Sequence, residues 1–378
     1  MHPEFQTDTV IIGAGIVGLA LAYTHAREGR RVTVFEREAR PVGASIRNFG
    51  MVWPIGQPAG PLLRRALRSR EIWEQVAVSA GIWHEPLGSL HLAYREDEWA
   101  VMEEFAAASA EQGYACELLS PAQTLELSAA AHPEGLLGSL WSRTEMIVDA
   151  REVPSKLIPW LQETYGVEFR FGTAVTRIGE GRIGTAAGTW RFDTAWVCSG
   201  ADFETLFPEV FADSGLTKCK LQMMRTAPQP GGWRMGPALC GGLTLTHYAS
   251  FASCATLPAL KARIRTETPW FPEWGIHVMM SQNGLGELVI GDTHEYGPTH
   301  DPFLREELNQ YILDYLAGMA RMPDAQIAER WYGVYAKSTR GGSEFLAHPL
   351  PGVTVVTGVG GAGMTMSFGL AEELVQGS

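Results

Sequence analysis

The sequence predicts an α/β fold in which a nucleotide-binding domain with a parallel sheet is interrupted by an inserted α+β domain with an antiparallel sheet. Three observations predict it. A strand, a glycine-rich turn and a helix follow one another at residues 9–28, and the same succession closes the chain at residues 353–375. Between them, residues 217–300 contain short strand-like runs with aromatic residues and paired glycines, as antiparallel sheets do. A discontinuous first domain that holds an insertion explains all three.

The composition limits what the chain can bind. Its 378 residues suffice for two structural units, and the 46% of hydrophobic residues supply their cores. The formal net charge of -12 argues against a nucleic-acid partner, which needs a basic surface, and against docking on an anionic membrane. A few local cations can still hold an anionic substrate.

The cysteine pattern is typical of a reducing compartment. The five cysteines are an odd number and include no CxxC pair, so we expect neither a disulfide framework nor a metal site. The N-terminus lacks a signal-peptide pattern, and no apolar run reaches the roughly 20 residues that span a bilayer. We therefore expect a cytoplasmic protein without a membrane segment.

The first βαβ unit is the best-defined local structure. Residues 9–12 read as a buried strand, 13–18 as a tight turn, 18–28 as a helix closed by Gly29, and 31–36 as the next strand. Further helices are expected at residues 62–80, 97–112, 301–319 and 364–375. Further strands are expected at 166–171, 174–178, 190–192, 195–198 and 353–356 and within 217–255, with a hairpin through 181–188.

The turn of this unit matches the GxGxxG fingerprint of dinucleotide binding. Gly13 permits the tight turn, Gly15 lets the backbone approach a pyrophosphate, and Gly18 allows close packing of helix on strand. The helix N-terminus then offers its N–H groups to phosphate. Glu36 ends the next strand, roughly 20 residues on, where a carboxylate accepts hydrogen bonds from ribose hydroxyls and repels a 2′-phosphate. This favours FAD or NAD over NADP; a glycine turn without a ligand is the alternative.

Four segments of the sequence, taken together, resemble one protein family. They are TVIIGAGIVGLA (residues 9–20), RVTVFER (31–37), TAWVCSGA (194–201) and VTGVGGAGMTMSFGLAE (356–372). Together they resemble the D-amino-acid oxidase / glycine oxidase / sarcosine oxidase family of flavoproteins. The resemblance implies FAD as the cofactor and a FAD-binding Rossmann-like domain of the glutathione-reductase type. It also implies a C-terminal helix whose N-terminus stabilises negative charge on reduced flavin.

The resemblance implies how the chain divides and which residues meet FAD. Residues 1–85, 140–215 and 325–378 are expected to form the FAD-binding domain, and residues 86–139 and 216–324 the substrate-binding domain. The expected FAD-binding residues are Gly13, Ala14, Gly15, Ile16, Val17, Gly18, Glu36, Arg37, Ser45, Arg47, Asn48, Phe49, Gly50, Met51, Val175, Ser199, Gly200, Trp331, Gly333, Gly360, Gly361, Ala362, Gly363, Met364 and Thr365.

We expect FAD to be bound non-covalently. Relatives of the sarcosine oxidase type attach flavin through a Cys that follows the substrate domain, and residues 325–350 contain no Cys. Other relatives use a His near the N-terminus, and residues 40–60 contain none.

One segment resembles a narrower branch of the family. SIRNFGMVWPIGQP (residues 45–58) is similar to oxidases associated with aminophosphonate breakdown, which implies a substrate such as 2-aminoethylphosphonate or its N-methyl derivative. Met51, Trp53 and Gln57 of this segment are candidates to face the flavin ring, with core packing as the alternative for Trp53.

The substrate anion is expected near residues 335–340. ERWYGVY (residues 329–335) resembles a family segment Trp-x-Gly-x-Arg, whose Arg clamps the substrate carboxylate. Tyr335 stands at the position of that Arg, which argues against an ordinary α-amino acid. Lys337 and Arg340 follow directly, and both residue types suit carboxylate or phosphonate oxygens. Solvated surface positions are the alternative for both.

The other substrate candidates are ring side chains. His247 and Tyr248 lie where the family often places an active-site wall, and a histidine can donate a hydrogen bond to an anionic substrate. Tyr332 and Tyr335 are candidates to line the amine end. Ordinary packing is the alternative for each of them.

The resemblance implies oxidation of a small primary or secondary amine that bears an anionic group, such as glycine, sarcosine or 2-aminoethylphosphonate. A hydride passes to flavin N5, the imine hydrolyses, and O2 reoxidises the flavin with release of H2O2. Other functions stay open: a D-amino-acid dehydrogenase with a non-oxygen acceptor, a non-amine FAD or NAD oxidoreductase, and a non-enzymatic or tRNA-modifying FAD-binding relative. The acidic charge argues against the tRNA partner.

Overall fold

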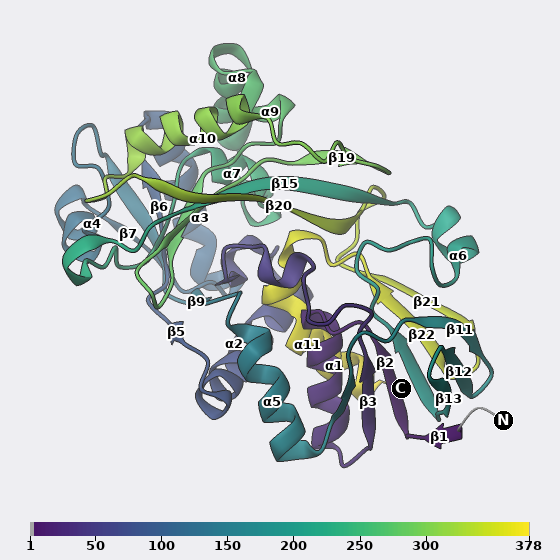
Figure 1. Cartoon of the computed structure of the whole chain (residues 1–378). Helices are drawn as coiled ribbons and strands as arrows, with labels where there is room; N and C mark the ends of the chain where they lie inside the picture. The colour runs from purple at the N-terminus through teal and green to yellow at the C-terminus, as the bar shows by residue number, and fades with distance from the viewer. Residues whose placement is uncertain (1–3, 378) are drawn as a thin grey trace.

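Strands from both ends of the chain form the central sheet of the first part of the molecule (Figure 1). The computed structural model describes residues 4–377. The sheet has the order β10 (Glu168–Arg170), β3 (Val32–Phe35), β2 (Thr9–Ile12), β14 (Thr194–Val197), β22 (Val353–Thr357) and β21 (Phe345–Leu350). Its pairs are parallel except for β21 with β22. The carboxyl ends of β2, β14 and β22 therefore meet at one edge of the sheet.

Helices cover one face of this sheet, and a second sheet covers the other. The helices are α1 (Ile16–Arg27), α2 (Pro61–Ala80), α5 (Val153–Tyr165) and α11 (Gly363–Gln376). The second sheet has the order β1 (Glu4–Gln6), β13 (Gly188–Arg191), β12 (Arg182–Thr185) and β11 (Val175–Gly179). The alternation of β2 explains both layers, because Ile11 enters the core under the helices while Val10 and Ile12 enter the other core.

The second part is built on a largely antiparallel sheet. Its order is β19 (Glu295–Gly297), β15 (Leu216–Thr226), β18 (Leu288–Gly291), β17 (Met279–Gln282), β16 (Ala238–Cys240), β6 (Ser89–Ala93), β8 (Gly138–Ser142) and β7 (Cys116–Leu119), and β20 (Ile327–Ser338) also pairs with β15. Its helices are α3 (Glu96–Gln112), α4 (Pro121–Leu127), α7 (Leu243–His247), α8 (Leu257–Glu267), α9 (Trp270–Glu273) and α10 (Glu306–Met319). The strand-like segment between the two glycine turns thus forms the predicted antiparallel sheet.

Two local predictions were wrong. Residues 243–253 are helical, in α7 and the 3-10 turn Ala249–Ser253, where the sequence predicted strands. The chain leaves the sheet at Gly241 and Gly242, which pack so closely on Tyr315 and Glu98 that no Cβ would fit. The predicted helix at residues 301–319 starts only at Glu306.

The late start of α10 has a local cause. The buried Lys220 ammonium donates to the carbonyls of Asp301 and Phe303, at 2.8 and 2.9 Å. These carbonyls satisfy a buried charge, and the segment before Glu306 stays irregular.

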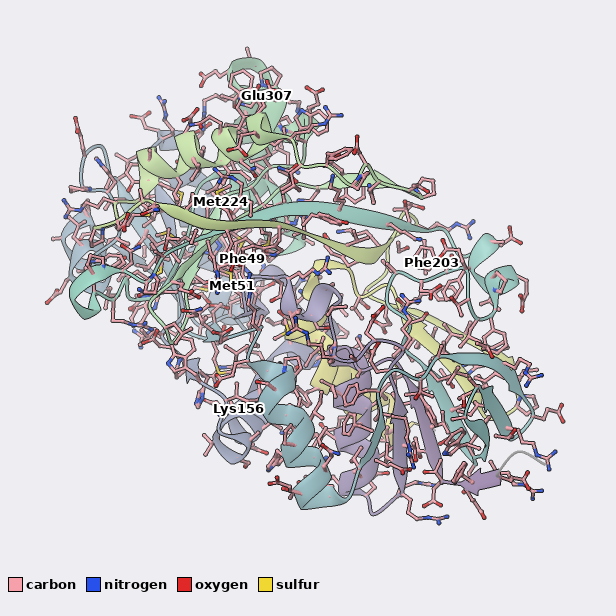
Figure 2. All side chains as sticks on the ribbon, in the orientation of Figure 1. Phe49, Met51, Lys156, Phe203, Met224 and Glu307 are labelled. Carbon is pink, nitrogen blue, oxygen red and sulfur yellow. The ribbon has the colours of Figure 1, made fainter. Side chains whose placement is uncertain are left out.

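A small three-stranded sheet links the two parts. β4 (Met51–Val52) pairs with β9 (Met146–Val148), which pairs with β5 (His84–Glu85). Phe49 and Met51 lie where the two parts meet (Figure 2), and both pack on the core of the antiparallel sheet. The domain boundaries stay a prediction. β20 begins just after the predicted boundary at residue 325, yet it pairs with β15 along most of its length.

None of the helices within residues 4–377 combines the length and the apolar character needed to cross a membrane.

We expect Gly18→Ala to destabilise the fold. A Cβ at Gly18 would lie 2.0 Å from the Gly13 carbonyl oxygen, so the turn and α1 would have to move apart. The expected loss is about 1–3 kcal/mol in the free energy of unfolding, measured by urea denaturation. Gly318→Ala in α10 is the control, since its Cβ meets no atom within 4 Å. Equal stability of both variants would contradict the tight packing of the turn.

We expect acid to destabilise the protein partly through His91. This ring is fully buried, and burial lowers its pKa from 6.5 to about 3, so the folded state stays neutral while the unfolded chain takes up a proton below pH 6.5. His91 therefore removes about 2 kcal/mol of unfolding free energy between pH 7 and pH 5. His91→Met should show a correspondingly smaller loss in urea titrations at the two pH values. His348→Asn, at an exposed position, should behave as wild type. An unchanged pH dependence in His91→Met would exclude the ring as the cause.

Candidate active site

A cavity of about 1160 Å³ lies between the two parts. It is larger than the roughly 300–1,000 Å³ of typical small-ligand sites, so it has room for an extended cofactor and a small second molecule. Most of the predicted cofactor residues line it: Gly13, Gly15, Ile16, Val17, Glu36, Arg37, Ser45, Arg47, Asn48, Phe49, Met51, Val175, Ser199, Gly200, Gly333, Gly360, Gly361, Ala362, Gly363, Met364 and Thr365. Trp53, Gln57, His247, Tyr248, Tyr335 and Lys337 line it as well.

The first glycine turn forms one wall of the cavity. Gly13 has a φ of +105°, and a Cβ there would lie 2.3 Å from the carbonyl oxygen of Cys198, so the turn needs glycine for both conformation and space. The Ser45 hydroxyl accepts a 2.8 Å hydrogen bond from the Ile16 N–H in the first turn of α1. No acidic side chain lies in that turn, which keeps the positive end of the helix dipole open to an anion.

Glu36 is held at the end of β3. Its carboxylate accepts hydrogen bonds from the backbone N–H groups of Ala14 and Glu38, both at 3.0 Å. These two bonds fix the carboxylate beside the glycine turn, and each oxygen keeps a second lone pair. Arg37 instead forms an ion pair with Asp202 at 2.5 Å across the mouth of the cavity.

The C-terminal glycine turn lies against the first one. Gly358 and Gly360 have φ values of +73° and +59° and turn the chain from β22 into α11. A Cβ at Gly363 would touch the Ile16 side chain at 3.6 Å, so the N-termini of α1 and α11 lie side by side. The hydroxyl of Thr365 accepts a 2.8 Å bond from the Trp53 N–H, which ties α11 to the segment of residues 45–58.

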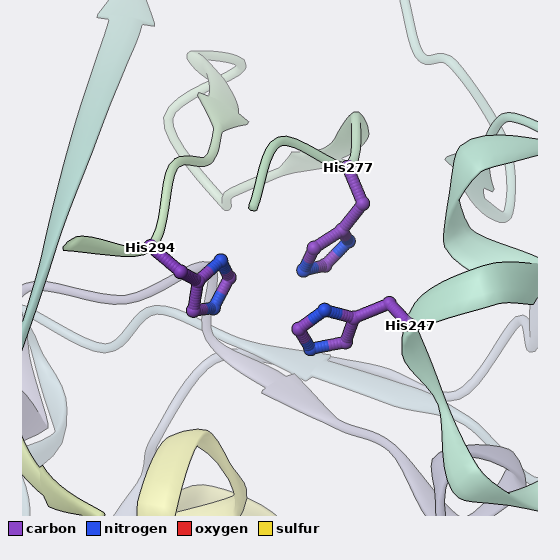
Figure 3. Close-up of side chains that lie close together, drawn as sticks. All are labelled: His247, His277 and His294. Carbon is purple, nitrogen blue, oxygen red and sulfur yellow. The ribbon is translucent and has the colours of Figure 1, made fainter. Parts of the chain in front are cut away.

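Three histidines occupy the cavity on the side of the antiparallel sheet. Figure 3 shows His247, His277 and His294 turned toward one another from three separate segments. The rings of His247 and His277 are stacked with centroids 3.8 Å apart, and His294 lies 4.8 Å from His247. Burial and the neighbouring histidines lower the pKa of His247 and His277 well below 6.5; burial lowers that of His294 to about 4. All three rings are therefore neutral at pH 7.

A buried acid and a buried phenol complete this end. The Asp292 carboxylate lies 3.2 Å from His277 Nε2, and burial raises its pKa well above 3.8. Its Oδ1 atom has no well-aligned hydrogen bond within the described residues. Burial also raises the pKa of Tyr248, whose hydroxyl meets, among the described residues, only the weak acceptor Met279 Sδ at 3.5 Å.

Lys337 lies between the histidines and the C-terminal glycine turn. It is on β20, its residue forms a backbone bridge with Val359, and its side chain reaches to 3.5 Å from the Cβ position of Gly360. No carboxylate within residues 4–377 is close enough to form an ion pair with it, although the chain has an excess of acids. The Tyr335 hydroxyl lies near Gly361 instead, about 3.5 Å from its Cβ position.

Some predicted residues lie outside the cavity lining. Tyr332 stacks with Arg47 and Lys220, and exposed Arg340 donates to the Asp213 carbonyl at 2.8 Å. Ala14, Gly18, Gly50 and Trp331 also lie outside it, and they support the turns and strands around it. Arg340 and Tyr332 therefore do not line the cavity in which a substrate could bind.

Sequence reasoning missed His277, Asp292 and His294. Each lies beside a short apolar strand, β17 or β18, in a segment without a recognisable pattern. A polar residue next to a buried strand is the only signal in the sequence, and it does not indicate which such residues meet.

Comparison with known proteins assigns the fold to a family. The family described as FAD dependent oxidoreductase (DAO) matches residues 8–376. The chain belongs to this family of FAD-dependent oxidoreductases. Its cofactor is FAD, and the predicted fold class and family resemblance are confirmed. Two adjacent helix N-termini on one cavity fit such a dinucleotide, and so do two glycine turns in which Gly13, Gly18 and Gly358 leave no room for a Cβ.

Solved structures of similar fold cover nearly the whole oxidoreductase. Glycine oxidase from Geobacillus kaustophilus has a TM-score of 0.77 at 20% identity, covering 100% of this chain and 94% of that one. L-proline dehydrogenase from P. horikoshii has a TM-score of 0.76 at 19% identity, covering 100% and 95%.

Curated relatives match over shorter stretches. D-amino-acid oxidase of Streptomyces coelicolor is 33% identical over 82 residues, or 21% of this chain and 26% of the relative. Glycine oxidase of Geobacillus kaustophilus is 25% identical over 160 residues, or 40% and 42%. The matches thus span less than half of either relative's length.

We expect Glu36→Gln to weaken FAD binding by the oxidoreductase. The substitution keeps the size of the side chain but removes the charge that strengthens its hydrogen bonds, a loss of about 1.5–3 kcal/mol. The dissociation constant for FAD should rise about 10- to 100-fold, measured by quenching of flavin fluorescence on titration of the apoprotein. Exposed Glu28→Gln is the control. An affinity equal to that of wild type would exclude Glu36 from the FAD site.

Proposed function

We propose that the enzyme oxidises a small primary or secondary amine that carries an anionic group. The observation that carries the proposal is Lys337, a cavity-lining cation without an ion-pair partner in the described chain. In a protein of net charge -12, an unpaired lysine beside a cavity favours an anionic ligand there. The neighbours named glycine oxidase and iminodiacetate oxidase act, by their names, on amines with carboxylates, which supports the same class.

We assign the FAD to the two glycine turns. Glu36 would bind the ribose and Val175 would contact the adenine, while the N–H groups at the start of α1 would hold the pyrophosphate. Gly360, Gly361 and the start of α11 would border the flavin. When bound, FAD supplies a ring that accepts a hydride from the substrate carbon. Within residues 325–350 no Cys is present, which supports non-covalent binding.

The chain's own residues would bind and orient the substrate. Lys337 would hold the anion, while Leu221, Met223 and Met279 make the neighbouring wall apolar and exclude water from the reacting carbon. The Tyr248 hydroxyl, which has only a sulfur acceptor in the described structure, is free to donate to the bound substrate. No acid–base pair is required, because a neutral amine with its C–H aimed at the flavin suffices.

The position of the cation favours an aminophosphonate over an α-amino acid. Tyr335 stands where the family resemblance places a carboxylate-clamping arginine, and its hydroxyl lies against the C-terminal glycine turn. Lys337 lies two residues after Tyr335 on the same face of β20, and it lines the cavity together with the histidines. An anion bound there leaves room for a linker between anion and amine, as in 2-aminoethylphosphonate or its N-methyl derivative.

We propose O2 as the electron acceptor.

The test is a substrate panel with two readouts. Purified holoenzyme is mixed with glycine, sarcosine, D-amino acids, iminodiacetate, 2-aminoethylphosphonate and its N-methyl derivative. Loss of the oxidised flavin absorbance without air reports substrate oxidation, and peroxide formation in air reports O2 as the acceptor. Bleaching by the aminophosphonates with peroxide release is expected. Bleaching without peroxide would indicate a dehydrogenase, and no bleaching by any amine would overturn the proposal.

We expect Lys337→Met to raise KM for the anionic amine about 10- to 100-fold, since a charge-assisted contact of about 1.5–3 kcal/mol is lost. The value of kcat should change little, because the anion is held equally in the ground and transition states. Lys156→Met is the control: this exposed lysine lies on α5, away from the cavity (Figure 2). An unchanged KM in Lys337→Met would remove this lysine from the anion site.

A further inference from the structure

The histidine cluster brings three potential metal ligands together from distant parts of the sequence. His247 ends α7, His277 precedes β17 and His294 follows β18. One ring nitrogen of each lies within 4.8 Å of the others (Figure 3). His277 and His294 are almost fully buried, and His247 has exposed surface on the cavity.

The surroundings of two of these rings leave lone pairs available. His294 Nδ1 lies 2.9 Å from the Gly275 carbonyl oxygen. A carbonyl only accepts, so Nδ1 carries the proton and Nε2 of the neutral ring presents a lone pair. The His277 ring lies beside the Asp292 carboxylate, 3.2 Å away. Protein oxygens next to ligating imidazoles are the usual outer shell of a metal site, because they set the tautomer and the ring orientation.

The three histidines alone are poorly suited to bind an anion, whether they are protonated or neutral. Three protonated rings this close would repel one another. When neutral, His294 presents an Nε2 lone pair, and His277 Nδ1 has no partner within the described residues. An anion gains nothing from such lone pairs. A metal cation bound by the lone pairs of neutral rings avoids the repulsion between protonated rings and also attracts an anion.

We propose that His247, His277 and His294 bind one divalent transition-metal ion of the Zn2+ class. Imidazole nitrogens suit this class, and three protein ligands leave one position open toward the cavity. A tetrahedral site with bonds of about 2.0–2.1 Å places its nitrogens roughly 3.4 Å apart. The ligand nitrogens, which lie within 4.8 Å of one another, must therefore move closer together when the metal binds. Rotation of the cavity-facing His247 side chain would allow this movement. Asp292 Oδ1, which lies 3.2 Å from His277 Nε2, would orient this ring and offset part of the metal's charge.

The open position has a direct use, which rests on the proposed function. The metal and Lys337 would place two positive centres in the same cavity, because Lys337 and the three histidines all line it. A phosphonate offers several oxygens and up to two negative charges, so one oxygen can bind the metal while another meets the lysine. The ion would anchor the substrate and would take no part in electron transfer.

The experiment measures metal and flavin in the same sample. Chelator-treated holoenzyme is incubated with Zn2+, desalted, and analysed for zinc and FAD per chain. Wild type should retain about one zinc, and His247→Ala and His294→Ala less than roughly a tenth of that, with FAD content unchanged. Retained FAD shows that a variant is folded. His348→Ala, an exposed histidine outside the cluster, should retain zinc as wild type does.

A second variant tests the outer shell. Asp292→Asn should weaken the zinc dissociation constant about 10- to 100-fold, measured by competition with a chromophoric chelator. Co2+ in place of Zn2+ should give tetrahedral ligand-field bands in wild type and none in His294→Ala. Failure of wild type to retain zinc, or equal retention by the histidine variants, would overturn the metal site.

The proposed function is tested separately. If the metal proposal alone is wrong, amine-dependent bleaching of the flavin persists in enzyme that binds no zinc. If the substrate class alone is wrong, zinc binds with the expected stoichiometry and no anionic amine bleaches the flavin.

Discussion

The structure depends on how closely the backbone crosses itself at the carboxyl ends of β2 and β14. The turn after β2 passes the end of β14 so tightly that a Cβ at Gly13 would lie 2.3 Å from the Cys198 carbonyl, and Gly18 closes on the same turn. Only this approach brings α1 and α11 side by side, with both N-termini at one edge of the sheet. Two aligned helix dipoles then face one cavity, which a dinucleotide such as FAD can fill.

The antiparallel sheet contributes the other wall and a different chemistry. Its strands supply an apolar surface and Lys337, while helix α7 and the loops beside β17 and β18 place the histidine cluster and a buried acid on the same cavity. Burying these polar groups costs folding free energy, because the described structure leaves His277 Nδ1 and Asp292 Oδ1 without hydrogen-bond partners. Such an expense at a cavity is typical of a binding site, where a ligand or ion supplies the missing partner.

Much of the fold could be predicted from the sequence. The strand–glycine–helix units at both ends predicted a discontinuous nucleotide-binding sheet, because buried parallel strands and glycine turns leave strong local patterns. The helicity of residues 243–253 was not readable, since it follows from the contact of Gly241 and Gly242 with Tyr315 and Glu98. Of the polar residues that line the far end of the cavity, His247 and Lys337 were predicted, because the family resemblance pointed to their segments. His277, Asp292 and His294 were not, because each stands alone in a loop.

The sequence by itself determined the family, the cofactor and the place where the cofactor's phosphates are expected. These depend on backbone conformation and close approach, which glycines at fixed spacing impose within a few residues of one another. The tertiary structure alone decided which polar side chains share the far end of the cavity. Loops between antiparallel strands carry no periodicity, and whether two of them meet depends on the pairing of β15, β17 and β18 rather than on any local pattern.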